Sequence, residues 1–234
     1  MNLKKLIINT STIKKYIDHT CVKPDATAKD IEKLCSEAVK YGFHSVCITP
    51  FRVKDTRRFL PKNSQIEIIC VIGFPFGVAT TEEKVNEAKI AAVDGATEID
   101  MIINIGAVKE GDWKYVSNEI SQIAKTIKPL ELKVIMEIGL LTKSELIEAC
   151  KIAIKSGAKF VKTSTGYGPR MPSPEDISLM KKTVGPKFKV KASGGIHDFV
   201  SAKKMIASGA DRIGTSHSLE IIGVKEKNIK KEKE

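Results

Sequence analysis

The chain has 234 residues, 42% of them hydrophobic, and no run approaches the roughly 18 consecutive apolar residues of a membrane span. These properties indicate a globular protein of one large domain or two small ones, with no membrane partner. The formal net charge is +11, but residues 1–15 hold four lysines and no acid, and residues 225–234 hold five lysines against three glutamates. Since much of the excess charge lies at the two ends, it does not by itself indicate a nucleic-acid partner.

Residues 1–15 contain an apolar run of only three residues, which is too short for a secretory signal, so we expect a cytoplasmic protein. The five cysteines form no C-x-x-C pair, which argues against a disulfide framework and a zinc ribbon. The four histidines show none of the spacings typical of metal ligands. We therefore expect no metal site.

Short β-branched runs recur along the chain, and helix-period segments lie between them. The runs predict eight strands, over 16–20, 45–49, 66–72, 97–105, 132–138, 159–164, 188–193 and 211–216. Amphipathic helices are predicted over stretches that include 27–42, 81–95, 142–157 and 197–209. Eight βα units in a chain of this length favour an α/β fold, a single-domain (β/α)8 TIM barrel. The barrel is predicted over 16–222, after an N-terminal segment with a short helix (1–15) and before a charged C-terminal tail (223–234).

Ionisable residues lie inside three of these strands. Period-two alternation places Asp100 on one face of the fourth strand, Lys162 on one face of the sixth and Lys191 on one face of the seventh. If these faces point inward, the three groups converge inside the barrel. The alternative is an ion-pair cluster without chemistry, but two neighbouring buried ammonium groups are costly unless they have a function.

Two neighbouring lysines suggest covalent chemistry. A nearby cation and partial desolvation both favour the neutral amine, which can attack a carbonyl and form a Schiff base. Lys162 is the candidate nucleophile and Lys191 the neighbouring cation. Asp100 would serve, directly or through water, in the proton transfers of carbon–carbon bond cleavage.

The loops after the seventh and eighth strands, KASGGIHD (191–198) and RIGTSHS (212–218), suggest a phosphate site. Barrels commonly bind phosphate there through backbone N–H groups. Gly194 and Gly195 permit close approach of the backbone, and Ser216 offers a hydroxyl. The alternative is a pair of ordinary turns that use glycine for conformational reasons.

The chain resembles the 2-deoxyribose-5-phosphate aldolase family of class I aldolases. The matching stretches are DHTCVKP (18–24), VIGFPFG (71–77), EIDMIINIGAVKEGDW (98–113), KVIMEIGLLT (133–142), FVKTSTGYG (160–168), VKASGGI (190–196) and RIGTS (212–216). The resemblance implies reversible cleavage of 2-deoxy-D-ribose 5-phosphate into D-glyceraldehyde 3-phosphate and acetaldehyde, without a cofactor. It leaves self-association as a homodimer open.

Carried over by position, the resemblance implies roles for individual residues. The Schiff-base lysine falls on Lys162, the second lysine on Lys191 and the proton-shuttling aspartate on Asp100. The phosphate and sugar pocket falls on Thr165, Gly166, Gly194, Gly195, Gly214 and Ser216. Asp18 and Thr20 match the polar residues that support the catalytic network.

The chain departs from the family at two phosphate-loop positions. His197 stands where an arginine is common and His217 where a second serine is common, so we expect phosphate binding to depend on histidine protonation. The loop Tyr167–Pro172 is also bulkier than usual. Two alternatives remain open: another Schiff-base aldolase on the same barrel, and a non-catalytic basic barrel that binds nucleic acid.

Overall fold

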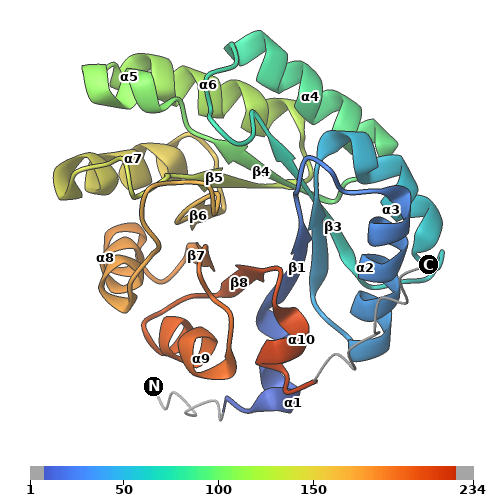
Figure 1. Ribbon diagram of the computed structural model, residues 1–234. Helices are drawn as coiled ribbons and strands as arrows, with labels where there is room; N and C mark the ends of the chain where they lie inside the picture. Colours follow the sequence, from blue (N-terminus) through green and yellow to red (C-terminus); the bar gives the residue numbers. More distant parts are fainter. Residues whose placement is uncertain (1–7, 225–234) are drawn as a thin grey trace.

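The computed structural model describes residues 8–224 and contains a closed barrel of eight parallel strands in chain order (Figure 1). This confirms the predicted (β/α)8 TIM barrel. The strands are β1 (Ile17–Cys21), β2 (Ser45–Ile48), β3 (Glu67–Ile72), β4 (Glu98–Ile102), β5 (Glu131–Ile135), β6 (Phe160–Lys162), β7 (Lys189–Ser193) and β8 (Arg212–Thr215). The barrel closes where β1 pairs with β8, with Asp18 opposite Gly214.

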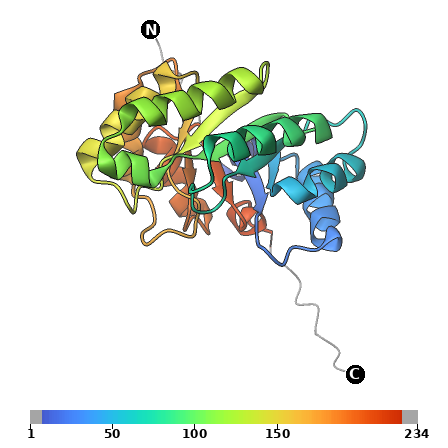
Figure 2. The same cartoon turned by 90° about the horizontal axis from the view of Figure 1, so that it is seen from above.

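Helices surround the strands, as Figures 1 and 2 show from two directions. The longer ones are α2 (Ala28–Tyr41), α3 (Val53–Phe59), α4 (Thr81–Asp94), α6 (Trp113–Thr126), α7 (Lys143–Lys155), α8 (Pro174–Val184) and α9 (Phe199–Ala207). The short ones are α1 (Thr10–Ile13), η1 (Lys14–Tyr16), η2 (Pro50–Arg52), α5 (Ile105–Glu110) and α10 (Ser218–Ile221). Within residues 8–224, no helix is both long and apolar enough to cross a membrane.

Local sequence signals explain where these helices begin and end. Thr27, Thr80 and Thr142 each cap a helix, and an acidic residue three positions later completes a capping box. Helices α2 and α4 end at glycines with positive φ, Gly42 and Gly95. These signals are why the predicted helix limits lie within about two residues of the observed ones.

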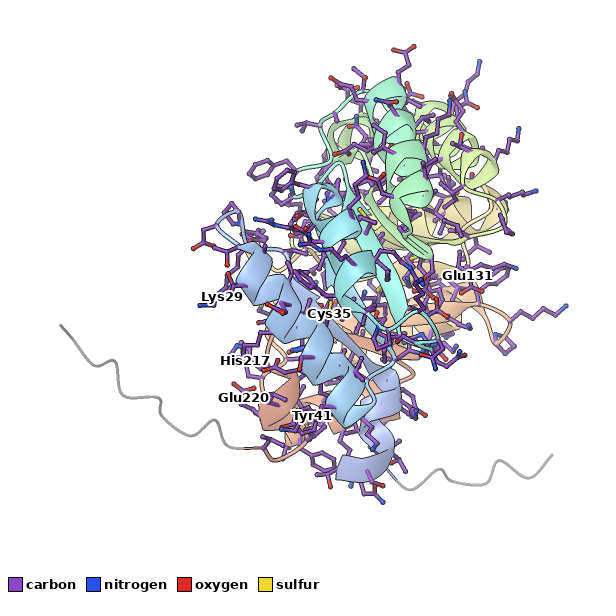
Figure 3. The ribbon with its side chains drawn as sticks, turned by 90° about the vertical axis from the view of Figure 1, so that its right-hand side faces the viewer. Lys29, Cys35, Tyr41, Glu131, His217 and Glu220 are labelled. Atoms are coloured by element: carbon purple, nitrogen blue, oxygen red, sulfur yellow. The ribbon has the colours of Figure 1, made fainter. Side chains whose placement is uncertain are left out.

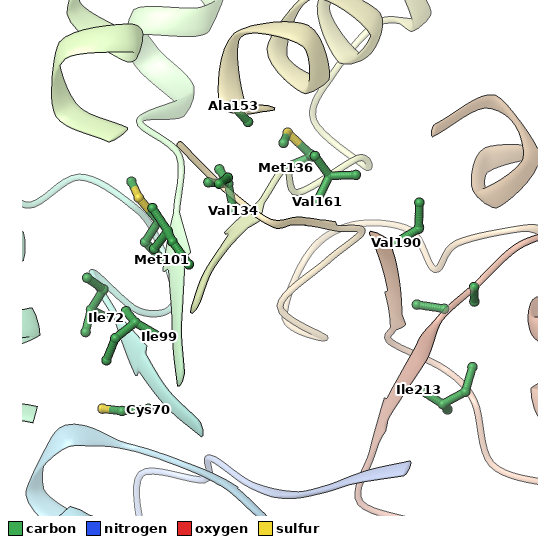
Figure 4. Packing of buried hydrophobic residues seen from close by; sticks show 14 of the residues in the cluster. Cys70, Ile72, Ile99, Met101, Val134, Met136, Ala153, Val161, Val190 and Ile213 are labelled. Carbon is green, nitrogen blue, oxygen red and sulfur yellow. The ribbon is translucent and has the colours of Figure 1, made fainter. Parts of the chain in front are cut away.

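Alternation along the strands separates two apolar layers. Residues such as Ile99, Met101 and Val134 belong to the large core between strands and helices (Figure 4). A smaller cluster of Cys47, Ile69 and Val71 belongs to the other face of β2 and β3. Since Asp100 lies between Ile99 and Met101, its side chain points into the barrel.

Some strands end at other residues than the sequence predicts. The fourth strand was predicted to run to residue 105, but β4 ends at Ile102 because the Asn104 side chain accepts a hydrogen bond from Ala107 N–H and caps α5. The short N-terminal helix is α1, followed by η1. Most of the predicted tail, 225–234, lies outside the described residues.

Candidate active site

Strand register brings four ionisable side chains to one level of the barrel. Asp100 on β4 pairs with Lys133 on β5, and Lys162 on β6 pairs with Lys191 on β7. All four residues are buried, with exposed fractions of 3% or less. The barrel interior therefore holds three lysines around one aspartate.

The Asp100 carboxylate contacts all three lysines. Its Oδ2 atom lies 2.9 Å from the Nζ atom of Lys162 and 2.9 Å from the Nζ atom of Lys191. Its Oδ1 atom lies 3.1 Å from Lys133 Nζ. Lys162 and Lys191 thus share one carboxylate oxygen, which keeps the two amines close to each other.

Charge and burial act in opposite directions on this cluster. Burial alone would raise the pKa of Asp100, but the ammonium groups of Lys133, Lys162 and Lys191 hold it well below its usual range. Burial alone would lower the pKa of Lys191, but the Asp100 and Asp18 carboxylates hold it well above its usual range. Asp100 is therefore ionised and a weak proton acceptor, and Lys191 stays a cation at neutral pH.

Asp18 on β1 provides the second carboxylate of Lys191. Its Oδ2 atom lies 2.6 Å from Lys191 Nζ, and its Oδ1 atom accepts a hydrogen bond of 2.8 Å from Ser45 Oγ. Burial would raise the pKa of Asp18, but Lys191 and then Lys133 lower it. Lys191 is thus held between two ionised carboxylates.

A pocket of about 620 Å³ opens above this cluster, at the carboxyl ends of the strands. Its lining includes eight residues predicted from the sequence: Thr20, Thr165, Gly166, Gly194, Gly195, His197, Gly214 and Ser216. Lys162, Lys191, Asp100 and Asp18 are not part of this lining. They lie deeper, in the barrel interior.

The glycine loop after β7 shapes one wall of the pocket. Gly194 and Gly195 have φ of 104° and 67°, a region that favours glycine. A Cβ atom at Gly195 would lie 2.8 Å from Met171 Cγ, so the loop is also tightly packed. Glycine at position 195 therefore lets the loop pack against Met171, and both glycines line the pocket.

The amino-acid sequence between residues 12 and 223 matches the family model of DeoC/LacD family aldolases. The chain belongs to this family. It is an aldolase, and its barrel interior is the candidate active site.

Relatives of this aldolase match it over most of its length. A deoxyribose-phosphate aldolase of Mycoplasmopsis pulmonis is 53% identical, covering 90% of this chain and 95% of the relative. A deoxyribose-phosphate aldolase of Thermococcus kodakarensis is 49% identical, and the match covers 92% of this chain and 97% of the relative. A solved structure described as the unique tetrameric structure of deoxyribose phosphate aldolase from Aeropyrum pernix has a TM-score of 0.84 and 31% identity, covering 92% and 91%.

Sequence reasoning missed two members of the aldolase's charged cluster, Lys133 and Glu98. Lys133 Nζ contacts Glu98 as well as Asp100, and carboxylates raise its pKa although burial opposes them. The sequence did contain a signal for Lys133, because this lysine interrupts an apolar strand as Lys162 does. Ser164, two residues after Lys162, is buried, and its Oγ has no hydrogen-bond partner among the described residues.

His197 and His217 lie together at the mouth of the aldolase's pocket. Their ring centroids are 4.3 Å apart with an interplanar angle of 75°. His217 Nδ1 lies 3.1 Å from Glu220 Oε1, and Figure 3 labels both residues where the chain passes from β8 into α10. Asp198, not His197, caps α9. His197 therefore does not cap this helix.

The described residues contain no group of three or more His, Cys, Asp or Glu side chains that could hold a metal ion. The carboxylates nearest the pocket floor, Asp18 and Asp100, are instead paired with lysines. The aldolase's interior is thus arranged around amines.

Proposed function

We propose that this protein is a class I aldolase that reversibly cleaves 2-deoxy-D-ribose 5-phosphate into D-glyceraldehyde 3-phosphate and acetaldehyde. The observation that carries the proposal is Lys162 beside Lys191, both 2.9 Å from the same Asp100 oxygen, beneath a glycine-lined pocket in a DeoC/LacD aldolase. The names of the relatives, deoxyribose-phosphate aldolases, support this substrate.

The first step joins the amine of Lys162 to C1 of the open-chain sugar. The nitrogen attacks the carbonyl, water leaves, and a protonated imine forms. Lys191 is a fixed cation beside this amine, because the Asp18 and Asp100 carboxylates hold it in place.

The second step breaks the C2–C3 bond. The C3 hydroxyl loses its proton, the C2–C3 electron pair moves toward the iminium, and D-glyceraldehyde 3-phosphate leaves with C3 as its aldehyde. The remaining enamine takes a proton at C2, and water then releases acetaldehyde and the free lysine. Asp100 lies within reach of both amines and serves, directly or through water, in these proton transfers.

The pocket above the cluster would hold the phosphate end. Gly194, Gly195, Gly214 and Ser216 surround it, with His197 and His217 at the mouth. No metal or organic cofactor enters this mechanism. We also propose a cytoplasmic enzyme, and self-association as a homodimer stays a prediction.

The test is to incubate the purified protein with 2-deoxy-D-ribose 5-phosphate and measure both aldehyde products, with and without a chelator. Equal amounts of acetaldehyde and D-glyceraldehyde 3-phosphate, unaffected by the chelator, are expected. Cleavage of other phosphorylated aldols without this one would favour a different Schiff-base aldolase, and salt-sensitive binding of nucleic acid without cleavage would favour the basic-barrel alternative.

A further inference from the structure

Glu137 lies just after β5 in an unusual conformation. Its φ is 52°, the only positive value among the described non-glycine residues, and its exposed fraction is 4%. A left-handed backbone is unfavourable for a glutamate, and strained residues of this kind occur often at functional sites. Glu137 plays no part in the lysine cluster described above.

The Glu137 carboxylate is buried without a cation. Among the described residues, no basic side chain forms an ion pair with it, and its Oε1 atom has no hydrogen-bond partner. Its Oε2 atom accepts two hydrogen bonds from one residue, Thr165: from the backbone N–H at 3.2 Å and from the hydroxyl. A buried, unpaired carboxylate is costly to the fold. Thr165 is the residue that Glu137 contacts through hydrogen bonds, and Thr165 lines the pocket, so we look for the function of Glu137 there.

These bonds fix the polarity of the Thr165 hydroxyl. A hydroxyl has one proton to donate and two lone pairs that accept. The Thr165 proton goes to Glu137, and the Tyr167 N–H donates to Thr165 Oγ1 at 3.0 Å. The hydroxyl can thus offer the pocket one lone pair and no proton.

Only one group of the phosphorylated aldehyde that adds to the enamine can donate a hydrogen bond to that lone pair. In D-glyceraldehyde 3-phosphate, the reacting carbonyl oxygen is an acceptor, and above pH 7 the phosphate oxygens are acceptors too, since the second phosphate pKa is about 6. The 2-hydroxyl alone carries a proton to donate.

We propose that Glu137 is a positioning residue that makes Thr165 a hydrogen-bond acceptor for the 2-hydroxyl of the acceptor aldehyde, and so selects a 2-hydroxylated substrate. This inference rests on the proposed function. It assigns Thr165 to the sugar hydroxyl, and leaves the phosphate to the glycine loops and the two histidines.

The experiment compares two acceptors in the addition of acetaldehyde at pH 8: D-glyceraldehyde 3-phosphate and 3-oxopropyl phosphate, which lacks only the 2-hydroxyl. The readout is the ratio of the two kcat/KM values, which does not depend on the fraction of active enzyme. Glu137→Leu and Thr165→Val should each lower this ratio roughly tenfold. Glu137→Gln keeps an oxygen for Thr165 and should preserve it.

Two further variants separate positioning from general damage. The double variant Glu137→Leu/Thr165→Val should have the ratio of Thr165→Val alone, because Glu137 acts through Thr165. Thr163→Val is the matched control: this buried threonine follows β6 too, but its hydroxyl donates to Ser193 O, so the ratio should not change.

An unchanged ratio in Thr165→Val would overturn the inference, and this holds even if Glu137→Leu fails to fold. So would a double variant in which the two single effects multiply. Borohydride trapping of acetaldehyde on the enzyme needs no acceptor, and it is measured in every variant. Wild-type protein that is not trapped would refute the proposed function, whereas normal trapping with unchanged ratios would refute only the role of Thr165 and Glu137.

Discussion

Replacing Asp100 with asparagine removes the carboxylate that contacts three buried lysines. Lys133 keeps its contact with Glu98, and Lys191 keeps its contact with Asp18. Among the described residues, Lys162 contacts no other carboxylate. The variant therefore leaves one buried lysine without a counter-charge, not three.

The expected loss of stability follows from that count. Removing one partner of a buried ion pair costs about 3–5 kcal/mol. For a domain of this size, each kcal/mol lowers Tm by about 2–4 °C, so Asp100→Asn should lower Tm by roughly 6–20 °C.

The dependence on pH has a definite sign. The pKa of Asp100 is lowered by folding, so its contribution is fully present above the ordinary aspartate value of about 3.9 and is lost only as pH falls through the lower folded-state value. The stability that the Asp100 carboxylate contributes to the wild type should therefore not depend on pH between about pH 5 and 8.

Urea unfolding and calorimetry at several pH values measure this difference. Glu148→Gln is the control, because its contact with Lys151 is exposed on α7 and should contribute less than about 1 kcal/mol. An Asp100→Asn protein within about 1 kcal/mol of wild type would show that the cluster is not held by this carboxylate.

Three further predictions concern other charged groups. Lys191→Leu should lower turnover at neutral pH by about 10²-fold or more, because the fixed cation beside Lys162 is lost; turnover close to that of wild type would assign Lys191 another role. His197→Arg should lower KM for the phosphorylated substrate, because arginine carries a permanent charge and bidentate donors that attract the phosphate dianion; identical KM values would leave phosphate binding to His217 and the glycine loops. Lys84→Met should lower the free energy of unfolding by about 3–5 kcal/mol without changing turnover per folded molecule, because Lys84 pairs with Glu119 at 2.8 Å between α4 and α6, outside the barrel. Adding Glu119→Leu should recover most of that loss, and a double variant no more stable than the single one would contradict this explanation.

The barrel and the meeting of Asp100, Lys162 and Lys191 were predictable because they depend on simple periodicities. Eight βα units imply a closed sheet, and alternation places a central strand residue on one of two faces. Lys189 shares the parity of Lys191 but lies at the start of β7, with its Nζ atom 3.9 Å from Glu131. Position along the strand, which can be read from the sequence, therefore distinguishes Lys191 in the site from Lys189 at the bottom rim of the barrel.

Contacts between distant loops were not predictable in this way. The hydrogen bonds from Thr165 to Glu137 join residues 28 positions apart. The positive φ of Glu137 could not be predicted either, because the usual sequence signal for this backbone conformation is glycine. The ring contact between His197 and His217 likewise depends on how two loops fold over the barrel. Lys133 differs from these contacts, because the sequence shows it as a lysine inside an apolar strand, as it does Lys162.

Borohydride reduction in the presence of acetaldehyde, followed by peptide mass mapping, tests the central claim most directly. Reduction of the imine leaves an ethyl group on the reacting nitrogen, and we expect it on Lys162 alone. Lys162→Arg keeps the positive charge beside Asp100 but forms no imine, so it should fold, remain unlabelled and be inactive. An ethyl group on another lysine, or an active Lys162→Arg protein, would contradict the assignment of Lys162 as the Schiff-base residue.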